Sequence, residues 1–258
     1  MSKFTKFIAL AMCALMLTLS LAGCSTTLDV DTIKSQGKIV MATSSGFPPF
    51  EYIAGGQCVG VDVDIANEIA KDLGVTLEVQ DMDFDSIIGA VKSGKVAMGV
   101  AGLSITEDRL KNVDFTIEYV NSKLFIIVKA DNADITGADS LSGKSIGVQT
   151  GTTSDTFASG VEGAEVLRYK TFLEAATAVS TGKVNCMIVD ELTAKEILAA
   201  NKDLKQLEEP FADENYAIAV QKGNESLLAA INSTLQRLKD EGKIEEYIYN
   251  HATAEAAE

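Results

Sequence analysis

The sequence predicts an α/β protein of two related lobes, each with a central, mostly parallel sheet flanked by helices. Short β-branched runs, typical of buried strands, alternate with helical periodicities along most of the chain. The segment Val91-Lys-Ser-Gly-Lys-Val-Ala-Met98 is echoed by Val179-Ser-Thr-Gly-Lys-Val-Asn-Cys186, and Gly37-Lys-Ile-Val40 by Gly143-Lys-Ser-Ile146. These echoes indicate a repeated unit, although α/β turns can also resemble one another by chance.

The segments predicted to be strands are short and rich in β-branched residues. In chain order they are Ile39–Thr43, Leu77–Gln80, Val96–Val100, Leu124–Val128, Ser145–Gln149, Val184–Val189 and Ala217–Val220. Helices are predicted between them, because apolar residues recur there at helical spacing and glycines end the runs. The predicted helices are Asp64–Leu73, Ser86–Lys92, an Ala-rich helix after the capping box Thr171-Phe-Leu-Glu174, and a long helix through Leu227, Ile231, Leu235 and Leu238.

The repeat sets the expected domain limits. Long strands near Glu118–Val128 and Tyr216–Val220 are expected to be the two crossings between the lobes, and thus the hinge. The first lobe then comprises residues 37–121 together with the C-terminal helices in 221–250, and the second lobe comprises residues 122–220. Residues 251–258 are expected to form a flexible tail.

The chain begins with a segment typical of a secretion signal. Lys3 and Lys6 precede an apolar run from Phe7 to Ala22, which is too short to span a bilayer comfortably. Leu21-Ala-Gly-Cys24 resembles the lipobox of bacterial lipoproteins, and a plain signal peptide is the alternative. We therefore predict a signal peptide over residues 1–23, lipidation (palmitate) at Cys24, a linker over residues 24–36, and an extracytoplasmic protein anchored to the bacterial cell membrane.

Charge and rare residue types exclude several functions. The net charge is −15, from 37 acidic and 22 basic residues without a Lys/Arg-rich run, which argues against nucleic acid as a partner. His251 is the sole histidine and no Cys-x-x-Cys occurs, so no metal, zinc site, cofactor or histidine-based triad is expected. Cys58 and Cys186 could form a disulfide in an exported protein, but two separate thiols are favoured.

Polar and aromatic residues follow the predicted strands at their carboxyl ends, where ligands bind in open α/β sheets. The first lobe has Phe47 after one strand and Arg109 after another. The second lobe has the hydroxyl-rich Thr150-Gly-Thr-Thr-Ser154, which suits an anion at a helix start, and Asp190. A cation and aromatics in one lobe, facing an anion site and a carboxylate in the other, suit a small zwitterion.

Arg109 lies in the first turn of a helix that Thr106 is predicted to cap. Cations are usually placed at helix C-termini, so an arginine here invites an anionic partner, and its planar guanidinium suits a carboxylate. The alternative is a surface salt bridge with Glu107, Asp108 or Asp114.

Several motifs occur together, namely Phe47-Pro-Pro-Phe-Glu-Tyr52, Gly60-Val-Asp-Val-Asp-Ile-Ala-Asn-Glu-Ile-Ala-Lys-Asp-Leu73, Asp83-Phe-Asp-Ser86, Leu103-Ser-Ile-Thr-Glu-Asp-Arg109 and Gly147-Val-Gln-Thr-Gly-Thr-Thr153. With them the chain resembles the extracellular solute-binding proteins of family 3, the receptors of polar amino-acid ABC importers. Val61 departs from the pattern, which commonly has a larger apolar residue there. The resemblance implies a monomeric type II periplasmic-binding fold whose lobes close on an amino acid.

The resemblance also implies roles for individual residues. Arg109 would grip the α-carboxylate, Asp190 would receive the α-ammonium, and Phe47 and Phe84 would sandwich the ligand's side chain. The full expected ligand-binding set is Phe47, Phe84, Gly102, Ser104, Arg109, Gln149, Thr153 and Asp190. Alternatives stay open at this point, because Asp190 and Thr153 could cap helices and the two phenylalanines could be core residues.

The leading functional hypothesis is a receptor that binds a free L-amino acid and serves an ABC permease and its ATPase. An enzyme related to the prephenate/arogenate dehydratases, with Glu51 or Glu118 as acid or base, is one alternative, and a sensory domain is another. Ser44 and Ser45 weaken the case for a basic ligand, whereas Glu51 or Glu118 could still reach a cation. A polar or sulfur-containing amino acid is also compatible with the residues.

We expect a further group of acidic residues to be solvated surface charge on a helix rather than a metal site. Its members are Asp62, Asp64 and Glu68.

Overall fold

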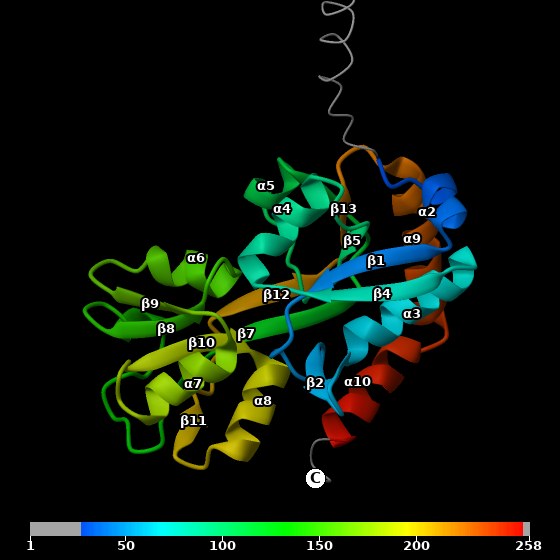
Figure 1. The fold of residues 1–258 in the computed structure, drawn as a ribbon. Helices are drawn as coiled ribbons and strands as arrows, with labels where there is room; N and C mark the ends of the chain where they lie inside the picture. The colour runs from blue at the N-terminus through cyan, green and yellow to red at the C-terminus, as the bar shows by residue number, and fades with distance from the viewer. Residues whose placement is uncertain (1–26, 255–258) are drawn as a thin grey trace, which may run out of the picture.

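Two sheets with helices on both faces carry the fold (Figure 1). The computed structural model describes residues 27–254, so the predicted signal peptide and Cys24 lie outside the described residues. The first sheet has the strand order β4-β1-β5-β13-β6 and the second has β11-β7-β10-β8-β9, with β12 paired to β7. The first lobe and the second lobe are named here after these two sheets.

The strands of the first sheet are β1 (Lys38–Thr43), β4 (Thr76–Asp81), β5 (Met98–Gly99), β6 (Val113–Phe115) and β13 (Ala219–Gln221). Those of the second are β7 (Val120–Lys129), β8 (Ser145–Gln149), β9 (Glu165–Tyr169), β10 (Cys186–Asp190), β11 (Leu204–Gln206) and β12 (Ala212–Tyr216). A separate hairpin pairs β2 (Tyr52–Ala54) with β3 (Gln57–Val59).

The helices of the first lobe are α2 (Val30–Gln36), α3 (Val61–Leu73), α4 (Ile87–Lys92), α5 (Glu107–Leu110), α9 (Glu225–Asp240) and α10 (Lys243–Ala254). Those of the second lobe are α6 (Thr153–Ser159), α7 (Phe172–Ser180) and α8 (Glu191–Ala200). Short 3-10 turns occur at η1 (Phe84–Ser86) and η2 (Ala138–Ser140). Helix α2 occupies residues that we expected to belong to the linker.

Both sheets are mixed rather than mostly parallel. Strand β1 is parallel to β4 and β5, and β8 is parallel to β9 and β10. The strands that follow or precede a crossing between lobes, β7, β12 and β13, pair antiparallel with their neighbours. The sheets are mixed because the chain enters the second lobe through β7 and leaves it through β12, which is adjacent and runs in the opposite direction.

Alternation along β1 explains why helices cover both faces of the first sheet. Ile39 and Met41 are fully buried against the cluster that includes α3 and α9, whereas Ala42 packs into the cluster formed with α4. Side chains of a strand point alternately to opposite faces, so an apolar run with no polar face must be covered twice. The same arrangement holds in the second sheet, where Ile127 and Ile126 enter different clusters.

The internal repeat is confirmed by matching backbone geometry. After α4, the amide of Lys95 donates to Ala90 O at 3.0 Å, and after α7 the amide of Lys183 donates to Ala178 O at 2.8 Å. Both turns then lead into a strand that is parallel to the strand that opens its repeated unit, β5 to β1 and β10 to β8. The repeated sequence therefore encodes a repeated helix-turn-strand unit.

The two crossings lie side by side. The amide of Tyr119 donates to Tyr216 O at 2.8 Å, and that of Thr116 donates to Ile218 O at 3.0 Å. Beyond them β7 and β12 continue as an antiparallel pair, which Figure 1 shows between the two halves. Because β13 already belongs to the first sheet, residues 219 and 220 lie in the first lobe and not in the second, where we expected them.

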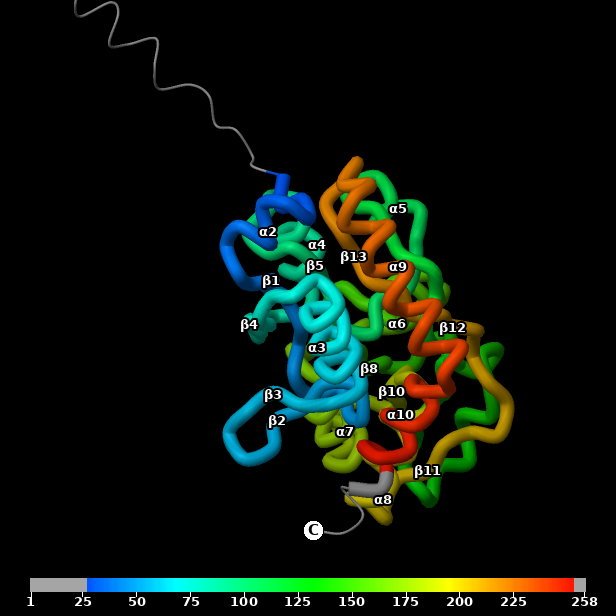
Figure 2. Tube along the Cα trace, turned by 90° about the vertical axis from the view of Figure 1, so that its right-hand side faces the viewer, coloured from blue at the N-terminus to red at the C-terminus, as the bar shows by residue number. Residues whose placement is uncertain are grey.

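The C-terminal helices α9 and α10 pack against α3, and Figure 2 shows them running along one side of the molecule. Helix α10 continues through His251 to Ala254, so residues 251–254 are helical rather than part of a tail. The ring of His251 contacts Tyr52 Oη at 3.0 Å and Asp64 Oδ2 at 2.8 Å. These contacts bind the end of the described chain to α3 and the β2–β3 hairpin.

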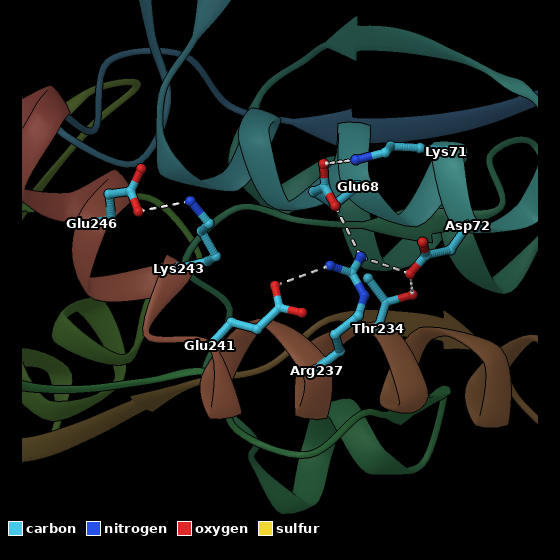
Figure 3. A network of polar contacts seen from close by, with 8 residues as sticks. All are labelled: Glu68, Lys71, Asp72, Thr234, Arg237, Glu241, Lys243 and Glu246. Carbon is cyan, nitrogen blue, oxygen red and sulfur yellow. Dashed lines mark hydrogen bonds and ion pairs between the residues drawn. The ribbon is translucent and has the colours of Figure 1, made fainter.

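An ion-pair network centred on Arg237 fastens α9 to α3 (Figure 3). Its guanidinium lies 2.8 Å from both Glu68 Oε2 and Asp72 Oδ2, and 3.4 Å from Glu241 Oε2. Hydrogen bonds to these carboxylates raise the pKa of Arg237 and lower those of Glu68 and Asp72. One side chain thus holds two helices that are far apart in sequence.

We expect Arg237→Ala to lower the free energy of unfolding by about 1–2 kcal/mol, because a network loses more than an isolated surface pair. The corresponding fall in Tm is about 2–6 °C, measured by thermal unfolding at low salt. Lys243→Ala is the matched control, since Lys243 makes a 2.8 Å pair with Glu246 on its own helix. Equal Tm shifts for the two variants would show that the Arg237 network adds nothing to an ordinary pair.

Candidate functional site

A small cavity lies between the two lobes. The first lobe contributes Phe47, Glu51, Phe84, Ala101, Gly102, Ser104 and Arg109 to its wall. The second contributes Gln149, Thr152, Thr153, Phe172 and Asp190. The structure thus gathers every residue of the expected ligand-binding set around one space.

Arg109 reaches the cavity from α5. Thr106 caps this helix as predicted, with its hydroxyl accepting from the amide of Arg109 at 3.2 Å. The guanidinium donates to Ser104 O at 2.8 Å and lies 5.4 Å from the centre of the Phe84 ring. No carboxylate of residues 27–254 forms an ion pair with Arg109, and burial lowers its pKa to about 10. Glu214 is the carboxylate whose charge acts on Arg109, and it forms no ion pair with it. A desolvated guanidinium without a directly paired carboxylate is suited to an anion.

The surface salt bridge considered for Arg109 is not formed. Asp108 pairs with Lys111 at 2.6 Å, and Asp114 pairs with Lys222 at 2.9 Å. Glu107 is exposed and has no ion pair within the described part of the chain. These partners leave the guanidinium directed toward the cavity.

Asp190 faces the same cavity from the end of β10. It stands at the first position before α8, yet its side chain makes no capping hydrogen bond. Its carboxylate instead accepts a hydrogen bond from the hydroxyl of Tyr216, which is fully buried at the second crossing. Burial raises the pKa of Asp190 to about 7, and the hydrogen bond from Tyr216 works in the opposite direction. Among the described residues no cation neutralises this carboxylate.

Aromatic rings form one wall of the cavity. Phe47 stacks on Phe50 with ring centres 5.3 Å apart, and it lies at the same distance from Phe172 of the other lobe. Tyr216 completes the group, with its ring centre 6.1 Å from that of Phe47. Phe47 is therefore both a core residue and a cavity residue. Phe84 is buried on the other part of the wall, beneath Arg109.

The lobes are closed on one another at the mouth of the cavity. Arg109 Nη2 donates to Gly151 O at 3.1 Å, and Lys170 Nζ lies 3.2 Å from Asp83 Oδ2 across the cleft. Gly151 has a φ of +77°, and a Cβ there would lie 2.9 Å from Asp85 Cβ. This contact requires glycine, so the sequence permits a close approach of the lobes at this point.

The model of the bacterial extracellular solute-binding proteins, family 3, matches residues 39–252 of the chain. The chain belongs to this family. It is 31% identical over 244 residues to the arginine-binding extracellular protein ArtP of Bacillus subtilis, across 92% of this chain and 94% of that protein. It is also 31% identical to the glutamine-binding protein GlnH of the same organism, across 83% of this chain and 81% of GlnH.

A solved structure of a relative has the same fold as this solute-binding protein. The substrate-binding protein AbpA of Streptococcus pneumoniae, bound to L-arginine, superposes with a TM-score of 0.83 at 34% identity, over 87% of this chain and 98% of AbpA. The fold is that of the type II periplasmic-binding proteins. This solute-binding protein is the component of an ABC importer that captures a polar amino acid between its two lobes.

Gly102 occupies a tight position in the solute-binding protein. Its φ is +53°, and a Cβ at this position would lie 2.6 Å from Phe47 Cε1. Its amide donates to Asp62 Oδ2 at 2.9 Å, so the amide is already used and only the carbonyl is free for a ligand. The hydroxyl of Ser104 likewise already donates to Glu214, a carboxylate that is 5% exposed on β12.

Apart from Asp190, the polar wall residues of the second lobe lie on one segment, from the end of β8 to the start of α6. Thr152, not Thr153, caps α6, because its hydroxyl accepts from the amide of Asp155 at 3.2 Å. The hydroxyl of Thr153 is thereby left for the cavity. Gln149 is buried, and its side-chain amide donates to Lys170 O at 2.8 Å. This bond fixes the orientation of Gln149 at the end of β8.

Sequence reasoning did not place Ala101, Thr152 and Phe172 in the site of the solute-binding protein. Thr152 lies inside the hydroxyl-rich segment that was singled out, but spacing alone does not say which hydroxyl caps the helix. Phe172 follows the capping residue Thr171, and only the closure of the lobes brings its ring to Phe47. Nothing in the pattern around Ala101 distinguishes it from an ordinary strand end.

Asp62 is another correction to the sequence reading. It was expected to be solvated, yet it is 0% exposed and accepts a hydrogen bond from Tyr119 Oη at 2.7 Å. Only Asp64 and Glu68 of that acidic group lie at the surface, paired with His251 and Arg237. Within residues 27–254 no group of three or more His, Cys, Asp or Glu side chains is placed to hold a metal ion.

The two cysteines of the described chain, Cys58 and Cys186, are both free, as favoured from the sequence. No helix of residues 27–254 has the length and apolar character needed to cross a membrane.

Proposed function

We propose that this protein captures a free L-amino acid by its α-carboxylate and α-ammonium groups and delivers it to an ABC permease driven by an ATPase. The observation that supports this most strongly is the placement of Arg109 and Asp190 on opposite lobes around one closed cavity. Neither group forms an ion pair with an opposite charge within residues 27–254. A zwitterion supplies one charge for each, and charge-assisted hydrogen bonds in a desolvated cavity are strong.

The remaining wall residues have supporting roles in this proposal. The Thr153 hydroxyl assists Arg109 at the carboxylate. The Gly102 carbonyl and the Ser104 hydroxyl accept hydrogen bonds from the ammonium or assist in binding the carboxylate. Phe47 and Phe84 flank the ligand's side chain. Gln149 is already bonded to Lys170 O, and it contributes shape and a fixed amide oxygen.

Closure is coupled to binding in this scheme. A ligand held by Arg109 and Asp190 makes contacts with both lobes at once, and such contacts exist only when the lobes are closed. The closed form also has the Lys170–Asp83 pair and the Arg109–Gly151 hydrogen bond. A permease can therefore recognise the loaded receptor by its closed shape.

We also propose that Cys24 anchors the receptor to the outer face of the membrane by lipidation, as its lipobox predicts, and that the protein acts as a monomer. Binding without turnover is proposed as well. Glu118 does not line the cavity, and among the described residues no histidine or lysine lines it beside Glu51 as a partner for acid–base catalysis.

Isothermal titration calorimetry of the ligand-free protein with a panel of free L-amino acids tests this function. We expect at least one of them to bind with a Kd of about 1 μM or less. The α-amide of the best ligand, which lacks the carboxylate, is the matched control, and its affinity should fall roughly 100-fold or more. A panel in which nothing binds more tightly than about 1 mM would refute the proposal.

A further inference from the structure

Glu51 is a cavity residue for which the α-amino-acid clamp has no use. It follows the turn that carries Phe47, and its side chain is 1% exposed. Its backbone is fixed by two bonds, because its amide donates to Phe47 O at 3.1 Å and its carbonyl accepts from the amide of Phe47 at 2.9 Å. One rigid turn thus places an aromatic ring and a carboxyl group on the same wall.

The carboxyl group of Glu51 has no donor to satisfy it. Both of its oxygens are buried, and no amide, hydroxyl or cationic group of residues 27–254 donates a hydrogen bond to them. The groups that act on it are acids, namely Asp62 first, then the thiol of Cys58, and Asp190. An ionised carboxylate in such surroundings is costly, so Glu51 must either hold a proton or face a cation.

Asp62 lies beside Glu51, and its negative charge opposes the ionisation of Glu51. Its two oxygens already accept from the Gly102 amide at 2.9 Å and from Tyr119 Oη at 2.7 Å. Burial raises the pKa of Glu51 well above its usual range and that of Asp62 to about 6, and the two carboxyls are close enough to share a hydrogen bond. Two carboxyls in this position share one proton at neutral pH.

We propose that Glu51 determines specificity: its carboxylate receives a guanidinium or ammonium at the end of the ligand's side chain, and this cation replaces the proton shared with Asp62. The inference rests on the proposed function, because Arg109 and Asp190 must hold the α-end for the side chain to reach this wall. On binding, the O–H bond of the acid pair breaks and the proton leaves to solvent. The ligand's cation then neutralises the carboxylate.

The two serines that weakened the case for a basic ligand do not bear on it. Ser44 and Ser45 are absent from the cavity wall. Ser45 instead binds Asp81 through its amide, at 2.8 Å, and through its hydroxyl, at 2.5 Å. The position that could recognise a cationic side chain is therefore Glu51, which lines the cavity seven residues after Ser44.

The first experiment compares L-arginine with L-citrulline, its uncharged isostere, on the wild-type protein. We expect arginine to bind roughly 100-fold more tightly, the effect of a charge-assisted pair in a buried site. Calorimetry at pH 7 in two buffers of different ionisation enthalpy should show about one more proton released per arginine than per citrulline. Asp190 acts on the ammonium of both ligands, so its proton release is common to both and cancels from the difference. Equal affinities, or equal proton release by the two ligands, would overturn the inference.

The second experiment uses Glu51→Gln, which keeps the shape of the protonated acid. Arginine should bind roughly 100-fold more weakly and citrulline within about threefold of wild type, and the excess of proton release for arginine over citrulline should disappear. Glu118→Gln, the same change near the first crossing but away from the cavity, should behave as wild type. A Glu51→Gln protein that still prefers arginine by the wild-type ratio overturns the inference and leaves the proposed function standing. A wild-type protein that binds no amino acid refutes the proposed function itself.

Discussion

Replacing Arg109 with alanine is expected to weaken amino-acid binding by about three orders of magnitude, because the α-carboxylate would enter a buried site without its counter-charge. The fold should persist. Arg109 has no ion pair with any carboxylate of the described chain, and burial already lowers its pKa to about 10. Glu214, the carboxylate whose charge acts on Arg109, keeps its hydrogen bond from the Ser104 hydroxyl. Removing Arg109 relieves the cost of its own burial but takes an opposite charge away from Glu214, so the Tm of the ligand-free variant should stay close to that of wild type.

Titration calorimetry gives the Kd, and thermal unfolding gives the stability, of both Arg109→Ala and Arg109→Lys. Lysine keeps the charge but loses the planar fork that spans Ser104 O and Gly151 O, so its affinity should fall between those of the alanine variant and wild type. Normal binding by the alanine variant would return Arg109 to a purely structural role at the cleft mouth.

Asp190→Asn is expected to weaken binding roughly 100-fold or more, because the α-ammonium loses its charged partner. The wild-type affinity should also depend on pH. Asp190 has a pKa of about 7, so acidification below that value neutralises the carboxylate and lowers the affinity by up to about tenfold per pH unit. The asparagine variant should lack this component of the pH dependence, as measured by calorimetry between pH 5 and 8 with a neutral amino acid.

The pH dependence of the stability of the ligand-free protein tests the same pKa of Asp190. Burial raises the pKa of Asp190 from 3.8 to about 7, so the folded state holds its proton more tightly than the unfolded state. The stabilisation from this group is complete below about pH 4 and is lost as the pH rises through 7. Thermal unfolding of wild type against Asp190→Asn should show this loss in wild type alone. Parallel pH profiles would mean that Asp190 is not desolvated in the free protein.

Much of the fold could be predicted from local pattern. The β-branched runs predicted the central strands of both sheets, because strands buried on both faces are apolar throughout. These strands are β1, β5 and β13 in the first sheet and β7, β10 and β8 in the second. Capping residues marked helix starts reliably, as at Thr106 and Thr171, since the cap hydrogen bond is local. The repeat was readable because its helix-turn-strand unit is contiguous.

Features that depend on distant segments were not predicted. Asp62 looks like a surface residue on an amphipathic helix, and only the approach of Gly102 and Tyr119 makes it a buried carboxylate. His251 was expected in a tail, yet the contact with Asp64 joins residues 187 positions apart. The direction of the pairings of β7, β12 and β13 likewise depends on how the chain returns between lobes, which no local periodicity records.

The site shows the same division. Residue types at strand ends predicted the charged pair Arg109 and Asp190, because parallel strands bring their carboxyl ends to one edge. The role of Glu51 could not be predicted from its residue type and its position. As a residue type it suggested a catalytic acid or a contact to a cation, and only its burial beside Asp62, without a donor, distinguishes these.

The position of β13 between β5 and β6 has a consequence for how the chain is made. The first sheet cannot be completed until residues 219–221 have been synthesised, whereas the second sheet draws all of its strands from residues 120–216. The second lobe is thus an uninterrupted unit with the more local contacts, and local contacts form fast. The first lobe must wait for its own last strand and helices, so the ligand site, which needs both lobes, can be completed only after residues 219–221 have been made.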